Sequence, residues 1–201
     1  LAGVNLVASA FDAVLPALIL PSPQGGEMAL GLVTSTAGVA MLIGSLLATF
    51  MRKPKDRVRV IYLSMLVSLS MENFLLAFTR TPVLWCLGQL IGWLPVPIMN
   101  ANLDVILRAS IPVEMQGRVY SCRNTLQFFT IPVGFFLGGF LVDQVCEPLM
   151  AQAAMDGGLV RLFGAGKGSG AAMVMFLLGT VGTLICLMFG QVLKKYHYDK
   201  I

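Results

Sequence analysis

The run MALGLVTSTAGVAMLIGSLLATFM (residues 28–51) is followed at once by RKPKDRVR (residues 52–59). The first stretch contains no charged residue, whereas the second contains five cations. A helix needs about 20 mainly apolar residues to cross the hydrocarbon core of a bilayer. Lys and Arg accumulate in short connections on the cytoplasmic side. The two stretches therefore predict a membrane-spanning helix that ends at the cytoplasmic face.

Five further apolar stretches lie on either side of this one in the 201-residue chain. Only 12% of the residues are charged and 57% are hydrophobic, whereas a soluble domain carries about 25% charged residues. So few charges would not cover a water-facing surface, and the lipid bilayer is the expected partner. We predict an all-α integral membrane protein that forms one transmembrane unit over residues 1–201. Its six transmembrane helices are expected at residues 3–20, 28–51, 60–79, 83–107, 119–142 and 171–193.

The positions of the 14 Lys and Arg residues predict how these helices are oriented. Alternate sides of the membrane hold 11 and 3 cations, which together make up the 14. The positive charge places both termini of the segment in the cytoplasm, with the protein in the cell (inner) membrane. The glycine-rich connection at residues 157–170 is then expected to be a flexible external loop. The 11 are Arg52, Lys53, Lys55, Arg57, Arg59, Arg108, Arg118, Arg123, Lys194, Lys195 and Lys200, and the 3 are Arg80, Arg161 and Lys167.

The first and fourth predicted helices are each interrupted by proline and carry polar side chains. Each of them leads a set of three, so the hydropathy pattern divides into three plus three helices. Matching interrupted, polar helices in two halves indicate a transport pathway. Proline also frees backbone carbonyls, which suits a helix that lines a cavity. The residues concerned are Asp12 and Pro16 in the first helix and Pro95, Pro97, Asn100, Asn102 and Asp104 in the fourth.

The acidic residues of the predicted helices have different expected roles. Asp12 lies near the middle of its helix, where a carboxylate is costly unless it meets water, a proton or a partner. A coupling role for Asp12 stands beside the alternative of a hydrogen-bonded structural role. Asp104 has Arg108 four residues later, and an ion pair between the two is the favoured interpretation. Glu72, in the third helix, is expected to have an interfacial or packing role rather than a role in proton coupling.

Small residues follow one face of the second and of the fifth predicted helix. Small side chains let neighbouring helices approach closely, so helix packing is the favoured interpretation and a place in the transport pathway is the alternative. The second helix carries Gly31, Ser35, Gly38, Leu42 and Ser45 on one stripe, and the fifth carries Gly134 and Gly138 as a G-x-x-x-G motif.

Two stretches are more specific: IPVEMQGRV (residues 111–119) follows the fourth predicted helix, and PVGFFLGGFLVD (residues 132–143) fills the fifth. The arrangement resembles the major facilitator superfamily, and within it the macrolide-efflux-like permeases. Their tenth helix is followed by a P-x-E-x-x-G-R-V loop, and their eleventh carries a P-x-G…G…D pattern. The stretches EPLM (residues 147–150) and FGAGKGSG (residues 163–170) are also similar to that group. The resemblance covers essentially the whole chain, aligned to helices seven to twelve of a twelve-helix fold.

This resemblance implies that the chain is the C-terminal half of a secondary active transporter, built as a 3+3 inverted repeat. It implies an N-terminal half as partner, in the same polypeptide, and proton-coupled efflux of a small amphipathic solute. The chain begins with Leu1 and lacks a secretory signal, so we expect it to be part of a longer protein. One departure from the family is Ala48, which stands four residues after Gly44 where the family's signature loop has aspartate. The resemblance places four residues at the central cavity, namely Asp12, Asn100, Asn102 and Asp104.

Arg118 follows Gly117 at the mouth of the fifth predicted helix. A guanidinium there can hold carboxylates or helix C-terminal carbonyls across a closing interface. We therefore interpret Arg118 as a candidate cytoplasmic gate residue. The alternative is an ordinary cationic anchor at the cytoplasmic face.

Other function classes receive less support from the sequence. An enzyme is not expected, because the single histidine, His197, lies in the tail and no G-x-S-x-G motif is present. Lys167 is followed by Gly168 rather than by Ser or Thr, so a nucleotide-binding P-loop is not expected. The widely spaced cysteines predict no metal site or cofactor, and the scattered cations predict no nucleic-acid partner. A six-helix membrane scaffold, or a partner-binding module without transport activity, stays open as the alternative function.

Overall fold

The computed structural model describes residues 2–153 and 157–195 of the chain. Every regular element in these two ranges is helical, and two of the elements are π-helical turns, labelled η1 and η2. The elements are α1 (Ala2–Ile19), α2 (Glu27–Phe50), α3 (Arg57–Leu66), η1 (Val67–Met71), α4 (Glu72–Phe78), α5 (Pro82–Trp93), α6 (Pro95–Ser110), α7 (Val113–Phe140), η2 (Leu141–Cys146), α8 (Glu147–Gln152), α9 (Gly158–Phe163) and α10 (Ser169–Lys195).

Consecutive elements join into six helices that are long and apolar enough to cross a membrane. The prediction of an all-helical membrane protein with six such helices is confirmed for the described residues. By the length and composition of its helices, the chain is a multi-pass membrane protein. The six candidate spans are Ala2–Ile19, Glu27–Phe50, Arg57–Phe78, Pro82–Ser110, Val113–Gln152 and Ser169–Gly190.

The fifth helix differs most from its predicted bounds of residues 119–142. It begins at Val113, directly after Pro112, and continues through η2 and α8 to Gln152. Proline is tolerated at the start of a helix because its missing N–H is not needed there, so the helix can begin directly after Pro112, its N-cap residue. The extension at the other end is helical because η2 adds a wide turn instead of breaking the helix.

The connection before the last helix also differs from the expectation of a flexible loop, because it contains the short helix α9. Phe163, at the end of α9, is buried. Its ring stacks on Phe78 with centroids 6.1 Å apart and packs against Phe176 at 5.7 Å. Aromatic pairs at such distances stabilise packing, so this cluster holds α9 against α4 and α10.

The fourth helix is interrupted where the sequence predicts it. Its two parts, α5 and α6, meet at Leu94 and Pro95. Pro95 and Pro97 lack backbone donors, so the helix cannot continue its regular hydrogen bonds through this point. By contrast, Pro16 lies inside α1 and Pro132 inside α7, and both helices continue.

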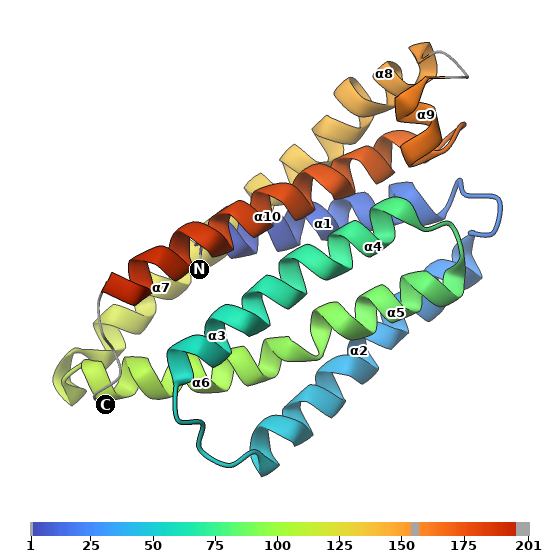
Figure 1. Cartoon of the computed structure of the whole chain (residues 1–201). Coiled ribbons are helices and arrows are strands. Elements are labelled where there is room, and N and C mark those ends of the chain that lie inside the picture. The colour runs from blue at the N-terminus through green and yellow to red at the C-terminus, as the bar shows by residue number, and fades with distance from the viewer. Residues whose placement is uncertain (1, 154–156, 196–201) are drawn as a thin grey trace.

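The connections lie alternately at two ends of the helix bundle (Figure 1). We call one end the basic end; it holds the α2–α3 connection (residues 51–56) and the α6–α7 connection (residues 111–112). The opposite glycine end holds the α1–α2, α4–α5 and α9–α10 connections. The cation-rich stretch of residues 52–59 lies at the basic end, whereas Arg80, Arg161 and Lys167 lie at the glycine end.

Helix α1 packs along α7 and α10 through one buried face. Val7, Phe11, Val14 and Leu18 are almost fully buried and lie on one helical face. Lipid tails are as apolar as these side chains, so close packing, not exclusion from water, favours this arrangement. The remaining main contacts join α2 to α5 and α6, α3 to α6, and α10 to α4.

The G-x-x-x-G motif of α7 lies at its contact with α1. A Cβ atom added at Gly134 would lie 2.6 Å from the carbonyl oxygen of Leu6, and one added at Gly138 would lie 2.6 Å from that of Ala10. Any side chain at either position would separate the two helices. The interpretation of these two glycines as helix-packing residues is confirmed.

The small-residue stripe of α2 behaves differently. A Cβ atom added at Gly31 or Gly38 would meet no atom of the described residues within 4 Å, and Leu42 is 68% exposed. Helix α2 packs instead through Gly44, whose position abuts the carbonyl oxygen of Leu94. The expectation that the stripe packs against a neighbour is therefore wrong within the described part of the chain.

Candidate translocation site

Asp12 faces an open cavity of about 680 Å³ between α1, α2 and α7. The polar residues of its lining are Asp12, Glu27 and Thr34, and apolar side chains such as Leu30 and Phe135 form much of the rest. Asp12 is exposed, and the described residues provide it with no hydrogen bond or ion pair. The structure thus places Asp12 at a cavity and not in a hydrogen-bonded structural contact.

Pro16 frees a backbone carbonyl group beside the carboxyl group of Asp12. It lies four residues after Asp12 and lines the same cavity. Because proline has no backbone N–H, the carbonyl oxygen of Asp12 loses its regular helical hydrogen bond. Asp12 therefore brings both a carboxyl group and a backbone carbonyl without its helical donor to this part of α1. The spacing of Asp12 and Pro16 is a sequence signal for this arrangement.

Asn100 and Asn102 lie on α6, which packs against α2, α3 and α5. Asn102 is buried, and its Oδ1 accepts a hydrogen bond of 2.9 Å from Nη1 of Arg57. Its Nδ2 donates to the carbonyl oxygen of Ile98, also at 2.9 Å. Asn102 thus ties α3 to α6, whereas Asn100 is exposed. No residue of α6 lines the Asp12 cavity.

Asp104 is paired with a residue that the sequence did not indicate. Nη1 of Arg123, on α7, donates to Oδ1 of Asp104 at 3.2 Å. The guanidinium of Arg123 also lies 5.8 Å from the ring centre of Tyr120, a cation–π contact. This pair joins α6 to α7, and among the described residues it replaces the expected pair of Asp104 with Arg108.

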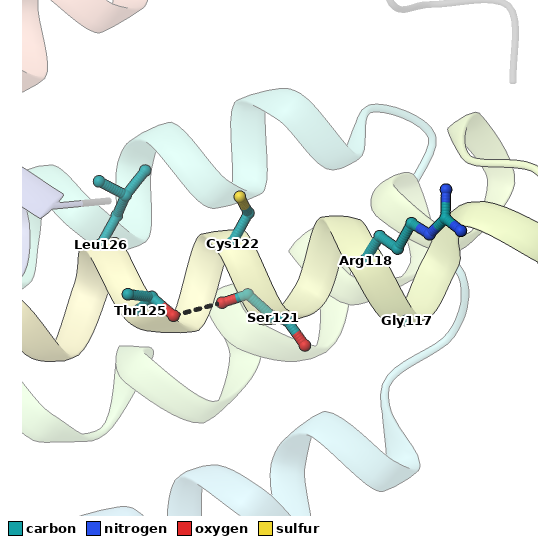
Figure 2. A pocket seen from close by; sticks show the side chains of 6 residues that line it. All are labelled: Gly117, Arg118, Ser121, Cys122, Thr125 and Leu126. Atoms are coloured by element: carbon teal, nitrogen blue, oxygen red, sulfur yellow. Dashed lines mark hydrogen bonds between the residues drawn. The ribbon is translucent and has the colours of Figure 1, made fainter.

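Arg118 is exposed near the start of α7. It borders an open depression of about 600 Å³ whose lining comes from α7 alone. Figure 2 shows Arg118 and Gly117 at one end of this depression, and Ser121, Cys122 and Thr125 along the helix. The Thr125 hydroxyl donates to the Ser121 carbonyl oxygen at 2.9 Å. Such an open, one-helix surface gives Arg118 no partner across an interface in the described residues, so its gate role stays a prediction.

Glu72 lies in a buried contact whose partner the sequence did not identify. It is only 6% exposed, directly after η1, and it faces Gly92 of α5. Of the two roles expected for Glu72, interfacial or packing, its burial against Gly92 agrees with packing. The signal was the G-x-x-x-G spacing of Gly88 and Gly92, because both glycines lie against α4.

Glu147 organises the glycine end of the bundle. Its Oε1 accepts a hydrogen bond from the backbone N–H of Gly168 at 2.7 Å, and its Oε2 accepts one from Gly170 at 3.0 Å. A carboxylate is favoured at the N-terminus of a helix, here α10. The two stretches that contributed to the family resemblance, residues 147–150 and 163–170, therefore meet.

Arg80 lies at the same end, in the α4–α5 connection, packed beside Gly164. Burial lowers the pKa of its guanidinium from the ordinary value, and the attraction of Glu147 acts in the opposite direction. An arginine keeps its charge under both influences. Arg80 and Glu147 thus place opposite charges where α4, α8 and α10 come together.

No family model, curated protein or solved structure matches the chain.

Proposed function

We propose that the chain is one six-helix half of a secondary active transporter of the major facilitator type. The position of Asp12 carries this proposal: an acidic residue, midway along an apolar helix with an internal proline, lines an open cavity. Ionisable residues inside membrane-spanning helices are costly and typically mark substrate or proton pathways. The resemblance of residues 111–119 and 132–143 to the superfamily agrees with this proposal.

The helix contacts support a repeat of three plus three helices. Numbered as six spans, the first contacts the fifth and the second contacts the fourth. The first span also contacts the sixth, and the third contacts the fourth. In addition, the third span contacts the sixth. Exchanging the two sets of three leaves these contacts unchanged, which agrees with an approximate twofold relation between inverted repeats. The contact of the fifth span with the sixth departs from this relation, because the second and third spans have no equivalent main contact among the described residues.

The exposed apolar side chains of α2 and α7 can be covered by lipid or by a second half of the protein. Leu42 on α2 is 68% exposed and Phe129 on α7 is 71% exposed. The stripe of Gly31 and Gly38 has room for close approach of another helix. We infer that the N-terminal half covers part of this face, completing a twelve-helix protein.

The mechanism follows from the carboxyl group of Asp12. When the cavity opens to one side of the membrane, Asp12 takes up a proton from the water there. When the cavity opens to the other side, Asp12 releases that proton. A solute that binds in the same cavity crosses the membrane in the direction opposite to the proton. The apolar walls and the acids Asp12 and Glu27 suit a small amphipathic compound, above all a cationic one. We further propose that the protein lies in the cell membrane with its basic end in the cytoplasm, and that it exports the solute.

Reconstitution tests the requirement for two halves. The described segment and the full-length protein are placed separately in lipid vesicles, and solute flux is measured under an imposed pH gradient. We expect flux from the full-length protein and none from monomeric segment. Gradient-driven flux from the monomeric segment would contradict the half-transporter proposal.

The second candidate function is a membrane scaffold. The same exposed face of α2 and α7 favours it, because such a surface can bind helices of a partner without moving a solute. Full-length protein that binds a partner but gives no flux under any gradient would favour the scaffold.

A further inference from the structure

The third span changes its helical form directly before its acidic residue. Helix α3 passes into the π-helical turn η1 at Val67, and Glu72 is the first residue of α4. A π-helical turn adds a residue to the helix and leaves backbone groups less regularly bonded, and it is often found at functional sites. Ser70 donates its hydroxyl to the carbonyl oxygen of Leu66, and Asn73 donates its Nδ2 to that of Leu69 at 2.8 Å. Polar side chains thus satisfy the carbonyls of this turn.

The turn directs Glu72 against the backbone of α5 at a position without a side chain. A Cβ atom added at Gly92 would lie 2.9 Å from Cβ of Glu72 and would overlap the carboxyl group. Gly88, one turn earlier, makes similar room for Leu76. The carboxyl group therefore occupies a recess that Gly92 creates, while Gly88 accommodates the neighbouring side chain of Leu76.

This recess does not satisfy the polar atoms around it. Oε1 of Glu72 is buried and accepts no hydrogen bond from the described residues. The indole of Trp93 lies beside the carboxyl group without completing a hydrogen bond. Gln89, which is 1% exposed, also has an unpartnered Nε2 on the same helix. Unpartnered buried polar atoms are rare in native proteins and call for an explanation.

No described cation faces Glu72 from the elements packed around it. Helix α5 carries no charged residue, α1 contributes the acidic Asp12, and the titratable side chain of α10 before its basic end is the Cys186 thiol. Its own span carries the phenol of Tyr62, and Arg57 and Arg59 lie about 20 Å away along the helix. Arg80 follows the span in the α4–α5 connection, and Arg161 lies on α9, which contacts α4. Helix α6 carries Asp104 and Arg108 near its basic end, where Asp104 pairs with Arg123.

We propose that Glu72 is a proton-binding site in the interior of the helix bundle, separate from the cavity of Asp12. Its carboxylate takes up one proton to become the neutral acid, which avoids the cost of an unpaired charge in the buried recess. The ionised form is the one that Trp93 can stabilise by donating its indole N–H after a small rotation. The proposed proton site does not depend on whether the chain transports a solute.

Infrared spectroscopy of the full-length protein in lipid vesicles tests this proposal directly. A protonated carboxylic acid has a carbonyl stretching band that a carboxylate and an amide lack. We expect this band at about pH 7, where an ordinary glutamate is ionised, and its loss in the Glu72→Gln variant. The matched control is Glu114→Gln, the same change at an exposed glutamate at the start of α7, which retains the band. An identical band in the parent and in Glu72→Gln would overturn the proposal.

A second measurement covers the case in which Glu72→Gln does not fold. Dicyclohexylcarbodiimide enters membranes and modifies protonated carboxyl groups, and mass spectrometry of peptides identifies the modified residue. We expect dicyclohexylcarbodiimide to modify Glu72 in the parent protein at about pH 7. A water-soluble carbodiimide should modify the exposed Glu114 and not Glu72. Modification of Glu114 alone by both reagents would overturn the proposal.

Discussion

Arg57 at the start of α3 and Asn102 on α6 are joined by a hydrogen bond of 2.9 Å from the guanidinium Nη1 to the amide Oδ1. Asn102 is buried and uses its own Nδ2 to hold the carbonyl oxygen of Ile98. This contact fixes the third span to the fourth near the basic end. It also makes Asn102, predicted as a cavity residue, part of a helix-to-helix contact.

Arg57→Ala should destabilise the folded protein by about 1–2 kcal/mol, because the buried oxygen of Asn102 loses its charged donor. The measurement is thermal unfolding of the purified protein in detergent. Arg59→Ala is the matched control, because Arg59 is exposed and its bond to Asp56 uses the backbone N–H. Equal shifts in the two variants would contradict a specific role for the Arg57–Asn102 contact.

Glu147→Ala should loosen the start of α10. The substitution removes both acceptors of the Gly168 and Gly170 N–H groups and the favourable charge at the helix N-terminus. We expect a loss of about 1–2 kcal/mol and faster hydrogen exchange at these two amides. Glu114→Ala, at an exposed glutamate, serves as the comparison. Unchanged exchange at Gly168 and Gly170 would show that Glu147 does not cap the helix.

Two glycine substitutions should separate the packing of the chain from its assembly. Gly138→Leu forces a side chain into the backbone of α1 and should abolish the folded state of the chain. Gly38→Leu meets open space and should leave the helical content and the monomer unchanged. In the full-length protein we expect Gly38→Leu to reduce transport strongly, since it blocks the face assigned to the other half. Full transport by this variant would remove α2 from the proposed interface.

Labelling of introduced cysteines tests the proposed orientation. Lys55→Cys at the basic end and Lys167→Cys at the glycine end are matched changes of exposed lysines. In a cysteine-free background and intact cells, an impermeant thiol reagent should reach position 167 and not position 55. The reverse pattern would invert the orientation.

The sequence predicts the helices much better than the site. Helix number and the interruption at Pro95 follow from apolar length and missing donors, which are local properties. A start of α7 close to Pro112 could have been predicted, because proline is favoured in the first turn of a helix. The pairing of Asp104 with Arg123 rather than Arg108 could not, because it depends on how α6 and α7 lie against each other.

Burial of acidic residues is likewise a property of the assembled bundle. Asp12 and Glu72 look alike in sequence, as single acids in apolar helices, yet one lines a cavity and the other is buried against Gly92. The difference arises from which face each helix turns to its neighbours, and the π-helical turn η1 shifts that face for Glu72. A strictly regular helix read from sequence would place Glu72 elsewhere.

The most direct test of the proposed transport function is proton-coupled flux in the full-length Asp12→Asn variant. Asparagine keeps the size and polarity of the side chain at the cavity but cannot carry a proton between the two sides. We predict normal expression and solute binding, with loss of pH-driven solute accumulation in vesicles. Asp104→Asn, where the aspartate pairs with Arg123 away from the cavity, should have a smaller effect. Flux at the parental rate in purified Asp12→Asn would contradict the assignment of Asp12 as the coupling residue.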